Sequence, residues 1–304
     1  MENIIVTAYF DIGRNDFKAI PRENNQYINY FRFWASIKNR MIIYTQSCFK
    51  DQIMQIRKEV GLEGKTEIIV VDDIGKIYPS LLEQMKKVSE NHYFTDIRIL
   101  ENATSNIANY SYLMLLKSWF LFDASKRVPK DSLISWVDFG FNHGNDLYLN
   151  SSEFEFLWEP KVDKNKVTVF ALKPYDGKPI FEIVRTLEDY MIGTVILLPP
   201  ALAESLNSLY LESMSNLLSV GLIDDDQLIL LMSVLKDPNK FNVIYCGWNE
   251  QFLKTTDRHF DTRDISSPNF LHKISIWYHK HKRAKRIIKR SNKLNKTNLK
   301  RILL

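Results

Sequence analysis

The stretch Leu133–Gly144 reads LISWVDFGFNHG and joins an apolar segment to a polar, glycine-containing loop. The apolar part, LISWV, predicts a buried β-strand that ends at Asp138. A strand that delivers a carboxylate into such a loop often supplies a binding site. The same carboxylate also serves as a cap for the loop backbone, and the stretch alone leaves both interpretations open.

Strands and helices alternate along the chain on the N-terminal side of this stretch. Runs of β-branched and aromatic residues predict the strands, and apolar residues at helical spacing predict the helices. The predicted strands cover residues 3–13, 40–46, 66–73 and 132–140, and the predicted helices cover residues 26–37, 48–61, 78–91 and 106–128. Such alternation with short connections is typical of βαβ units, which predicts an α/β fold with a parallel sheet covered on both faces.

Acidic residues stand where several of these strands are expected to end. In a parallel sheet the carboxyl ends of the strands share one edge, and ligands bind in the crevice beyond them. The acids therefore indicate a functional site at this edge, although they do not define its chemistry. They are Asp11, Asp72, Asp73 and Asp138.

The second half of the chain is less regular. Residues 166–174, 195–200 and 241–247 are expected to form strands, and residues 200–221 and 222–238 to form helices. Three adjacent acids, Asp224, Asp225 and Asp226, open the last of these helices, and Asp224 is expected to cap it. Capping does not need three acids, so at least one of them is expected to serve another purpose. Trp248, after the last strand, is expected to pack in the core, and stacking of its indole against a bound ligand is the alternative.

Several functional classes lack the residues that their chemistry requires. The triplet Asp-Phe-Gly at 138–140 also occurs in protein kinases, but Gly13 is the only glycine before residue 61, so the glycine-rich nucleotide loop is absent. A dinucleotide site of the Rossmann type fails for the same reason. The cysteines, Cys48 and Cys246, form neither a disulfide framework nor a metal-binding spacing.

Positive charge is concentrated at the C-terminal end of the chain. Of the 41 lysine and arginine residues, 12 lie between Lys273 and Leu304, where no acidic residue occurs. The other 29 are outnumbered by 36 acidic residues, so the rest of the chain has a net charge of about −7. We therefore predict a folded domain over residues 1–262 and a basic amphipathic tail over residues 263–304.

Aromatic and aliphatic residues alternate with the charges of this tail, which favours a helix lying on an anionic membrane surface. A solvated end and a nucleic-acid patch are the alternatives, and nucleic acid is the least expected partner. No apolar run reaches the roughly 18 residues that a membrane-spanning helix needs, and no basic region of a secretory signal precedes the first strand. We expect a cytoplasmic protein at the inner face of the cell membrane.

Four segments, taken in order, carry a resemblance to a known family. They are IIVTAYFDIGR (4–14), YINYFRFWASIKN (27–39), SWVDFGF (135–141) and GLIDDDQ (221–227). Together they resemble the bacterial HtrL/YibB family, whose members look related to glycosyltransferases of the GT-A fold. The resemblance covers roughly residues 3–252. It implies a GT-A-like α/β fold, with a Rossmann-like mixed sheet flanked by helices, followed by the basic helical tail.

The resemblance also implies a reaction. A glycosyltransferase of this kind would move a hexose, of the galactose type, from a UDP-linked donor to a surface-polysaccharide or lipid-linked glycan intermediate. Departure of the nucleoside diphosphate builds up negative charge, which a divalent metal ion or fixed cations must stabilise. The alternative is a membrane-associated interaction protein that keeps the fold without catalysing a reaction.

A metal site is expected at the end of the strand that precedes Asp138. GT-A enzymes usually hold Mn²⁺ or Mg²⁺ with an acid-x-acid pair at this place. Here the first acid is Asp138, and Gly140 stands in the place of the second. Asp138 is therefore expected to bind the metal with help from His143. The missing second acid is the feature that favours the non-catalytic alternative.

The resemblance assigns expected roles to further residues. The first strand, its loop and the helix before Asp138 are expected to contact the donor nucleotide and its phosphates. For Lys117 and Arg14, a side chain that extends into solvent is the alternative. Asp225 or Asp226 is expected to take the proton of the acceptor hydroxyl. The expected donor-binding residues are Thr7, Tyr9, Asp11, Arg14, Lys117, Asp138 and Gly140.

Overall fold

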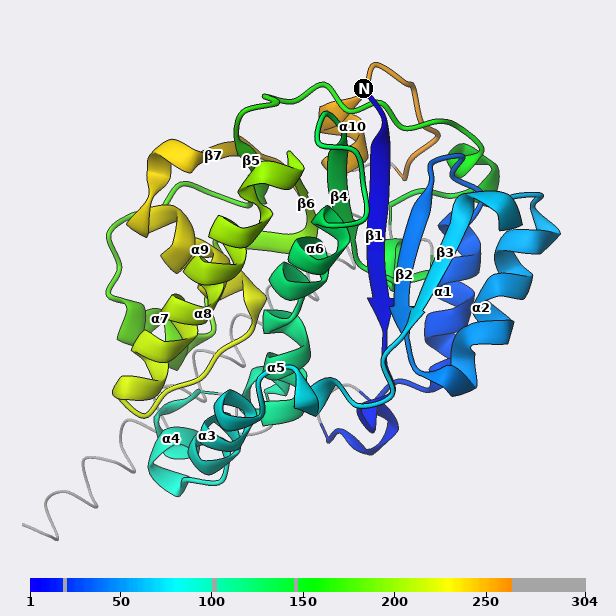
Figure 1. Cartoon of the computed structure of the whole chain (residues 1–304). Helices are drawn as coiled ribbons and strands as arrows, with labels where there is room; N and C mark the ends of the chain where they lie inside the picture. Colours follow the sequence, from blue (N-terminus) through cyan, green and yellow to red (C-terminus); the bar gives the residue numbers. More distant parts are fainter. Residues whose placement is uncertain (19–20, 100–102, 145–146, 264–304) are drawn as a thin grey trace, which may run out of the picture.

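The computed structural model describes residues 1–18, 21–99, 103–144 and 147–263. Within these residues, seven strands form one sheet in the order β3-β2-β1-β4-β6-β5-β7 (Figure 1). Each strand overlaps a range predicted from the sequence, because the apolar runs that mark strands are local features. The strands are β1 (Asn3–Tyr9), β2 (Met41–Thr45), β3 (Thr66–Val70), β4 (Leu133–Val137), β5 (Val167–Ala171), β6 (Met191–Leu198) and β7 (Phe241–Tyr245).

The sheet is mixed. β1 pairs in parallel with β2 and with β4, and β2 pairs in parallel with β3. β6 lies antiparallel between β4 and β5, and β7 runs parallel to β5. The expected α/β class, with a mixed sheet flanked by helices, is therefore confirmed. The fully parallel arrangement predicted from the first half holds for β3, β2, β1 and β4.

Helices cover both faces of the sheet (Figure 1). They are α1 (Asn24–Trp34), α2 (Ser47–Glu59), α3 (Pro79–Ser89), α4 (His92–Ile97), α5 (Ala108–Leu115), α6 (Lys117–Ser125), α7 (Ile180–Thr186), α8 (Ala203–Ser219), α9 (Asp226–Lys236) and α10 (Gln251–Thr255). The strand β1 shows why both faces need covering. Ile4 and Val6 join a core with α5, α6, α8 and α9, while Ile5 and Tyr9 join a second core with α1, α2 and α10.

The single helix expected over residues 106–128 is in fact two helices. α5 ends at Leu115 and α6 begins at Lys117, with Leu116 between them at ψ −9°. The sequence has neither Gly nor Pro at this point, so no local signal marks the break. α5 packs against α3 whereas α6 packs against α8, and the break lets the two segments follow different neighbours. It also places Lys117 at the start of α6.

In the part of the chain that the structure describes, no helix is long and apolar enough to cross a bilayer. The basic part of the predicted tail, Lys273–Leu304, lies outside the described residues. Its role at a membrane and the domain boundary after residue 262 therefore stay predictions.

Candidate active site

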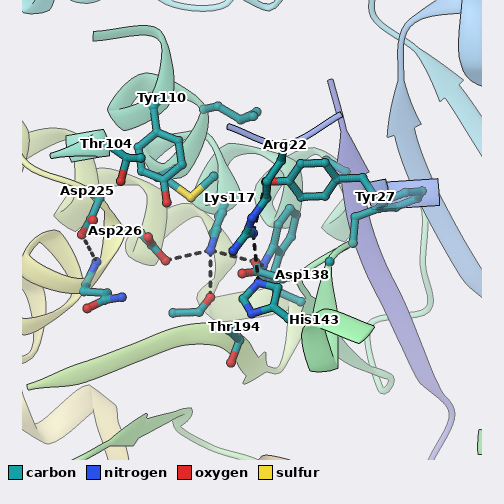
Figure 2. A pocket seen from close by; sticks show the side chains of 18 of the residues that line it. Arg22, Tyr27, Thr104, Tyr110, Lys117, Asp138, His143, Thr194, Asp225 and Asp226 are labelled. Atoms are coloured by element: carbon teal, nitrogen blue, oxygen red, sulfur yellow. Dashed lines mark hydrogen bonds and ion pairs between the residues drawn. The ribbon is translucent and has the colours of Figure 1, made fainter. Parts of the chain in front are cut away.

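A cavity of about 840 Å³ lies at the carboxyl ends of β1 and β4 (Figure 2). β1 contributes Tyr9, the loop after it contributes Arg14, and β4 leads directly into Asp138. The start of α9 and the loop after β7 complete the wall. This is the edge where the sequence predicted a site, and it is where α/β sheets bind their ligands.

Most residues predicted for the site line this cavity. Thr7 does not, because it lies fully buried within β1. Asp11 does not either, since it is exposed in the loop after β1. The predicted residues that do line the cavity are Tyr9, Arg14, Lys117, Asp138, Gly140, His143, Asp225 and Asp226.

The other acids expected at this edge bind backbone groups outside the cavity. A carboxylate that accepts a hydrogen bond from a nearby N–H stabilises a turn or a helix start. These acids therefore shape the loops after the strands, whereas Asp138 alone among the four faces the cavity. Asp11 accepts from the N–H of Gly13 at 2.8 Å, Asp72 from that of Ser47 at 2.8 Å, and Asp73 from that of Gly75 at 2.9 Å.

Lys117 lies at the centre of the site and is only 2% exposed. Its Nζ is 2.7 Å from Oδ1 of Asp138 and 2.8 Å from Oδ2 of Asp226. It also donates a hydrogen bond to the carbonyl oxygen of Gly193 at 3.0 Å. Burial alone would lower the pKa of Lys117, but the two carboxylates outweigh burial and raise the pKa. Lys117 is thus a fixed cation between two acids, and a side chain extended into solvent is excluded.

Gly193 in β6 allows this arrangement. A Cβ atom at position 193 would lie 1.7 Å from Oδ2 of Asp226, far inside the contact distance of the two atoms. Any side chain there would push the Asp226 carboxylate away from Lys117. Gly193 was not among the residues predicted from the sequence, although a glycine inside an apolar strand is itself a signal of close approach.

Asp138 is held by a second donor besides Lys117. The indole Nε1 of Trp136 donates a hydrogen bond to its Oδ1 at 2.6 Å, and the backbone N–H of Asp138 donates to the carbonyl of Thr194 at 2.9 Å. Burial raises the pKa of Asp138, and the positive charge of Lys117 opposes that rise. The carboxylate therefore has a fixed position in the cavity wall, and the interpretation of Asp138 as only a loop cap is not supported.

The three acids at the start of α9 have three different roles. Asp225 caps the helix, because its Oδ1 accepts a hydrogen bond at 3.2 Å from the N–H two residues further on. Asp224, the expected cap, is instead buried beside Arg98, with 3.5 Å between Oδ1 and Nη1. Asp226 pairs with Lys117. The predicted cap was wrong because the buried Arg98, distant in sequence, needs a carboxylate partner.

Asp225 combines a place in the cavity wall with a raised pKa. Burial, followed by repulsion from Asp224, Asp226 and Asp189, holds the pKa of Asp225 well above its ordinary value. A carboxyl group of this kind exchanges a proton with a substrate at neutral pH more readily than an ordinary aspartate. Asp226 is engaged by Lys117, so Asp225 is the better placed of the two predicted catalytic acids.

Arginines from the segment between β1 and α1 form another part of the wall. Arg14 was predicted, whereas Arg22 was missed because it follows a proline in an irregular segment and resembles an ordinary surface charge. Their guanidinium carbons lie 5.9 and 5.7 Å from the ring centroid of Tyr27. Figure 2 shows Arg22 and Asp225 on different sides of Lys117. The cavity therefore has a cationic wall and an acidic wall.

His143 belongs to the cationic wall. Nη1 of Arg22 lies 3.3 Å from its Nε2. Desolvation, together with the positive charges of Arg22 and Arg14, lowers the pKa of His143 to about 4. The imidazole is consequently neutral at physiological pH, and the charge of this wall comes from the arginines.

The residues expected to bind a metal ion do not fit one. The carboxylate of Asp138 is bound by the ammonium group of Lys117, and His143 lies beside the guanidinium of Arg22. Gly140 supplies no second acid. Over the described residues, no group of three or more His, Cys, Asp or Glu side chains is arranged to hold a metal. A divalent cation would therefore meet fixed positive charges where it needs oxygen ligands.

Trp248 lines the cavity from the loop between β7 and α10. It is 44% exposed, so the expectation that it packs in the core was wrong. The N–H of Gly247 donates to Oε2 of Glu250 at 2.9 Å, which closes the turn that carries the indole. An exposed indole beside a polar cavity offers an apolar face on which a sugar ring can stack.

The mixed sheet and the cavity at its edge, lined by paired acids and cations, define an α/β protein with a charged cavity at the carboxyl ends of its strands. The chain belongs to the bacterial HtrL/YibB family. That family's model, described as a bacterial protein of unknown function, matches residues 1–256. The family expected from the four sequence segments is therefore confirmed.

One curated protein and one solved structure are similar to this chain. Protein HtrL of Escherichia coli (strain K12) is 29% identical over 263 residues, which cover 82% of this chain and 89% of HtrL. The crystal structure of mouse xyloside xylosyltransferase 1 in its apo form aligns with 88% of this chain and 99% of its own, at 13% identity and a TM-score of 0.41. A TM-score at this level carries no argument about activity.

Proposed function

We propose that the protein is a GT-A-like glycosyltransferase that moves a hexose, of the galactose type, from a UDP-linked donor to the hydroxyl group of an acceptor glycan. One observation carries the proposal: a single cavity combines a carboxyl group suited to proton transfer, Asp225, with fixed cations. Transfer from a nucleotide sugar needs both, because the acceptor must lose a proton while the leaving diphosphate gains negative charge.

In the proposed reaction, the acceptor oxygen forms a bond to the anomeric carbon of the donor sugar. The bond from that carbon to the diphosphate oxygen breaks, and its electron pair leaves with UDP. The acceptor proton passes to Asp225, which suits transfer with inversion. Asp226 does not take part in the proton transfer, because it pairs with Lys117.

Lys117 and Asp138 have supporting roles in this scheme. Lys117 fixes the positions of Asp138 and Asp226 and is a positioning residue. The side chain of Asp138 remains 27% exposed, so it is available to accept hydrogen bonds from the hydroxyl groups of the donor sugar. No step of the proposed reaction passes through a metal ion, since the residues at Asp138 do not fit one.

The acceptor in this proposal is a surface-polysaccharide or lipid-linked glycan intermediate. We place the enzyme in the cytoplasm, at the inner face of the membrane. The basic stretch Lys273–Leu304 supports that place, because its charge suits an anionic lipid surface where lipid-linked glycans are extended.

The direct test is turnover of UDP-hexoses by the wild type, by Asp225→Asn and by the control Asp257→Asn. Asparagine caps a helix as well as aspartate does, so Asp225→Asn keeps α9 intact. It is expected to reduce transfer by about 100-fold or more, because the proton acceptor is lost. Asp257 is exposed and pairs with Lys161 outside the cavity, so its variant should keep full activity. Undiminished transfer by Asp225→Asn would remove Asp225 from the mechanism.

One observation favours a second candidate, a binding protein without turnover. Gly140 stands where the second acid of a metal-binding pair is expected, and the nearby acids Asp138 and Asp226 are neutralised by Lys117. Such a protein would bind a nucleotide or a glycan in calorimetry and yet consume no donor. Release of UDP from a UDP-hexose in the presence of acceptor would rule this candidate out.

A further inference from the structure

The segment between β1 and α1 brings two guanidinium groups into one wall of the cavity. The backbone N–H of Arg22 donates to the carbonyl of Arg14 at 3.2 Å, which closes the segment into a loop. Both side chains line the cavity, and both lie over the ring of Tyr27. The guanidinium of Arg14 also lies 5.0 Å from the ring centroid of Tyr110. Aromatic faces thus hold both cations in position.

The electrostatics of His143 show that the two arginines act on the same part of the cavity. The positive charges of Arg22 and Arg14 both contribute to the lowered pKa of that imidazole. Arg22 contacts neutral groups, the hydroxyl of Tyr27 and the imidazole of His143. Two guanidinium groups that lie in one wall attract the same bound anion.

The acidic wall is already neutralised in a different way. Lys117 lies between the carboxylates of Asp138 and Asp226, so the positive charge that a metal ion would bring is built into the chain. The charge of Lys117 is committed to these two acids. Among the described residues, Arg14 and Arg22 are the other lysine or arginine side chains that line the cavity.

We propose that Arg14 and Arg22 bind the diphosphate of the donor nucleotide and stabilise the leaving group without a divalent metal ion. This inference rests on the proposed glycosyltransferase function. Guanidinium groups bind phosphate oxygens through paired hydrogen bonds, and they keep their charge at any physiological pH. When the bond between the anomeric carbon and the diphosphate oxygen breaks, the electron pair stays on the diphosphate beside the two arginines. No redox partner or further reactant is required.

The test is calorimetric titration of the full chain with UDP and with GDP, in EDTA and again in MnCl₂. We expect at least one of the two nucleotides to bind, with affinities in EDTA and in MnCl₂ that agree within about twofold. Arg22→Gln and Arg14→Gln should each weaken that binding by about tenfold or more, because each removes a charged contact to phosphate. The two variants are independent, so one that fails to fold leaves the other as the test.

Arg32→Gln is the matched control. Arg32 lies on α1, pairs with Glu59 and does not line the cavity, so its loss should leave UDP binding unchanged. Binding that occurs only with Mn²⁺, or binding that survives in both arginine variants, overturns this inference and leaves the glycosyltransferase proposal standing. Absence of binding by both UDP and GDP, in both buffers, overturns both proposals together.

Discussion

At the scale of single residues, Lys117 determines the charge balance of the site. Removing water from a lysine and two carboxylates is unfavourable, and their mutual attraction compensates only while all three are present. The distances of 2.7 and 2.8 Å show that both contacts are direct. Loss of the cation would leave two buried acids facing each other.

We expect Lys117→Met to lower the free energy of unfolding by about 3–5 kcal/mol at neutral pH, because it leaves buried carboxylates without their counter-ion. Urea denaturation followed by circular dichroism measures the change. Lys161→Met serves as the control, since Lys161 and Asp257 form an exposed pair. Exposed pairs contribute about 1 kcal/mol or less. Equal, small effects of the two substitutions would show that the buried pairs contribute no more than a surface pair.

The raised pKa of Asp225 predicts how the transfer rate depends on pH. Only the deprotonated carboxylate accepts a proton, and burial beside other acids raises the pKa of Asp225. As pH is lowered, the transfer rate should therefore begin to fall at a pH well above the ordinary aspartate pKa of about 3.9. Rate measurements across pH 4–9 with a saturating donor check this. A profile already flat above about pH 5 would exclude Asp225 as the titrating base.

The same shift affects stability, and its sign follows from proton linkage. The folded state holds the proton of Asp225 more tightly than the unfolded state, so the contribution of this group to stability falls as pH rises through the raised pKa. Asparagine at position 225 does not ionise, so Asp225→Asn avoids this loss of stability, and it keeps the cap of α9. The variant is expected to unfold at a higher urea concentration than the wild type at neutral pH.

At the scale of elements, Gly193 in β6 leaves the space in which the Asp226 side chain of α9 lies against the sheet. Gly193→Ala places a methyl group where the Asp226 carboxylate now lies. We expect a loss of about 1–3 kcal/mol in unfolding free energy from overpacking, together with loss of transfer, because Asp226 can no longer hold Lys117. Gly64→Ala is the control, because nothing lies within 4 Å of the place that a methyl group would take there. Full activity of Gly193→Ala would mean that Asp226 can move without consequence.

Elements marked by local patterns were predictable from the sequence. The apolar runs predicted every strand of the described sheet, and Gly61 and Gly221 end their helices with φ near +72° as their type suggests. The break at Leu116 was not predictable, because it follows from packing against α3 and α8 and not from a breaking residue. Local patterns therefore indicate where the strands lie, while tertiary contacts determine where the long helix breaks and which residue caps α9.

The same difference between local patterns and tertiary contacts explains which parts of the site could be predicted from the sequence. Lys117, Asp138 and the acids at the start of α9 could be singled out from their place in the expected strands and helices. Their partners could not, because Lys117 and Asp226 are separated by 109 residues. Arg98 likewise pairs with Asp224, from which it is separated by 126 residues. Asp225 therefore caps the helix in place of Asp224.

At the scale of the whole molecule, charge divides the chain into two parts. The 12 basic residues of Lys273–Leu304 contrast with an acidic remainder. An anionic lipid surface should attract the tail and repel the rest of the chain. The distribution of charge, and not the net value of +5, therefore governs which surfaces the protein approaches.

Truncation before Lys273 is expected to abolish binding to vesicles that contain phosphatidylglycerol and to leave turnover of a soluble donor intact. Sedimentation with the vesicles measures binding, and neutral phosphatidylcholine vesicles are the control. Binding of the full chain should weaken as salt shortens the Debye length below about 8 Å. If the truncated chain sediments as well as the full one, the tail is not an anchor. If the full chain prefers oligonucleotides at matched salt, its partner is nucleic acid.

The late position of Asp226 in the chain has a consequence for synthesis on the ribosome. Lys117 and Asp138 emerge early, but β6 and Asp226 follow only after many more residues have been translated. Until then, the edge of β4 lacks its antiparallel neighbour and the lysine lacks one of its carboxylates. A nascent or prematurely terminated chain therefore presents an open sheet edge to chaperones and proteases. β6 covers that edge before Asp226 is translated, and Asp226 then supplies the second carboxylate of Lys117.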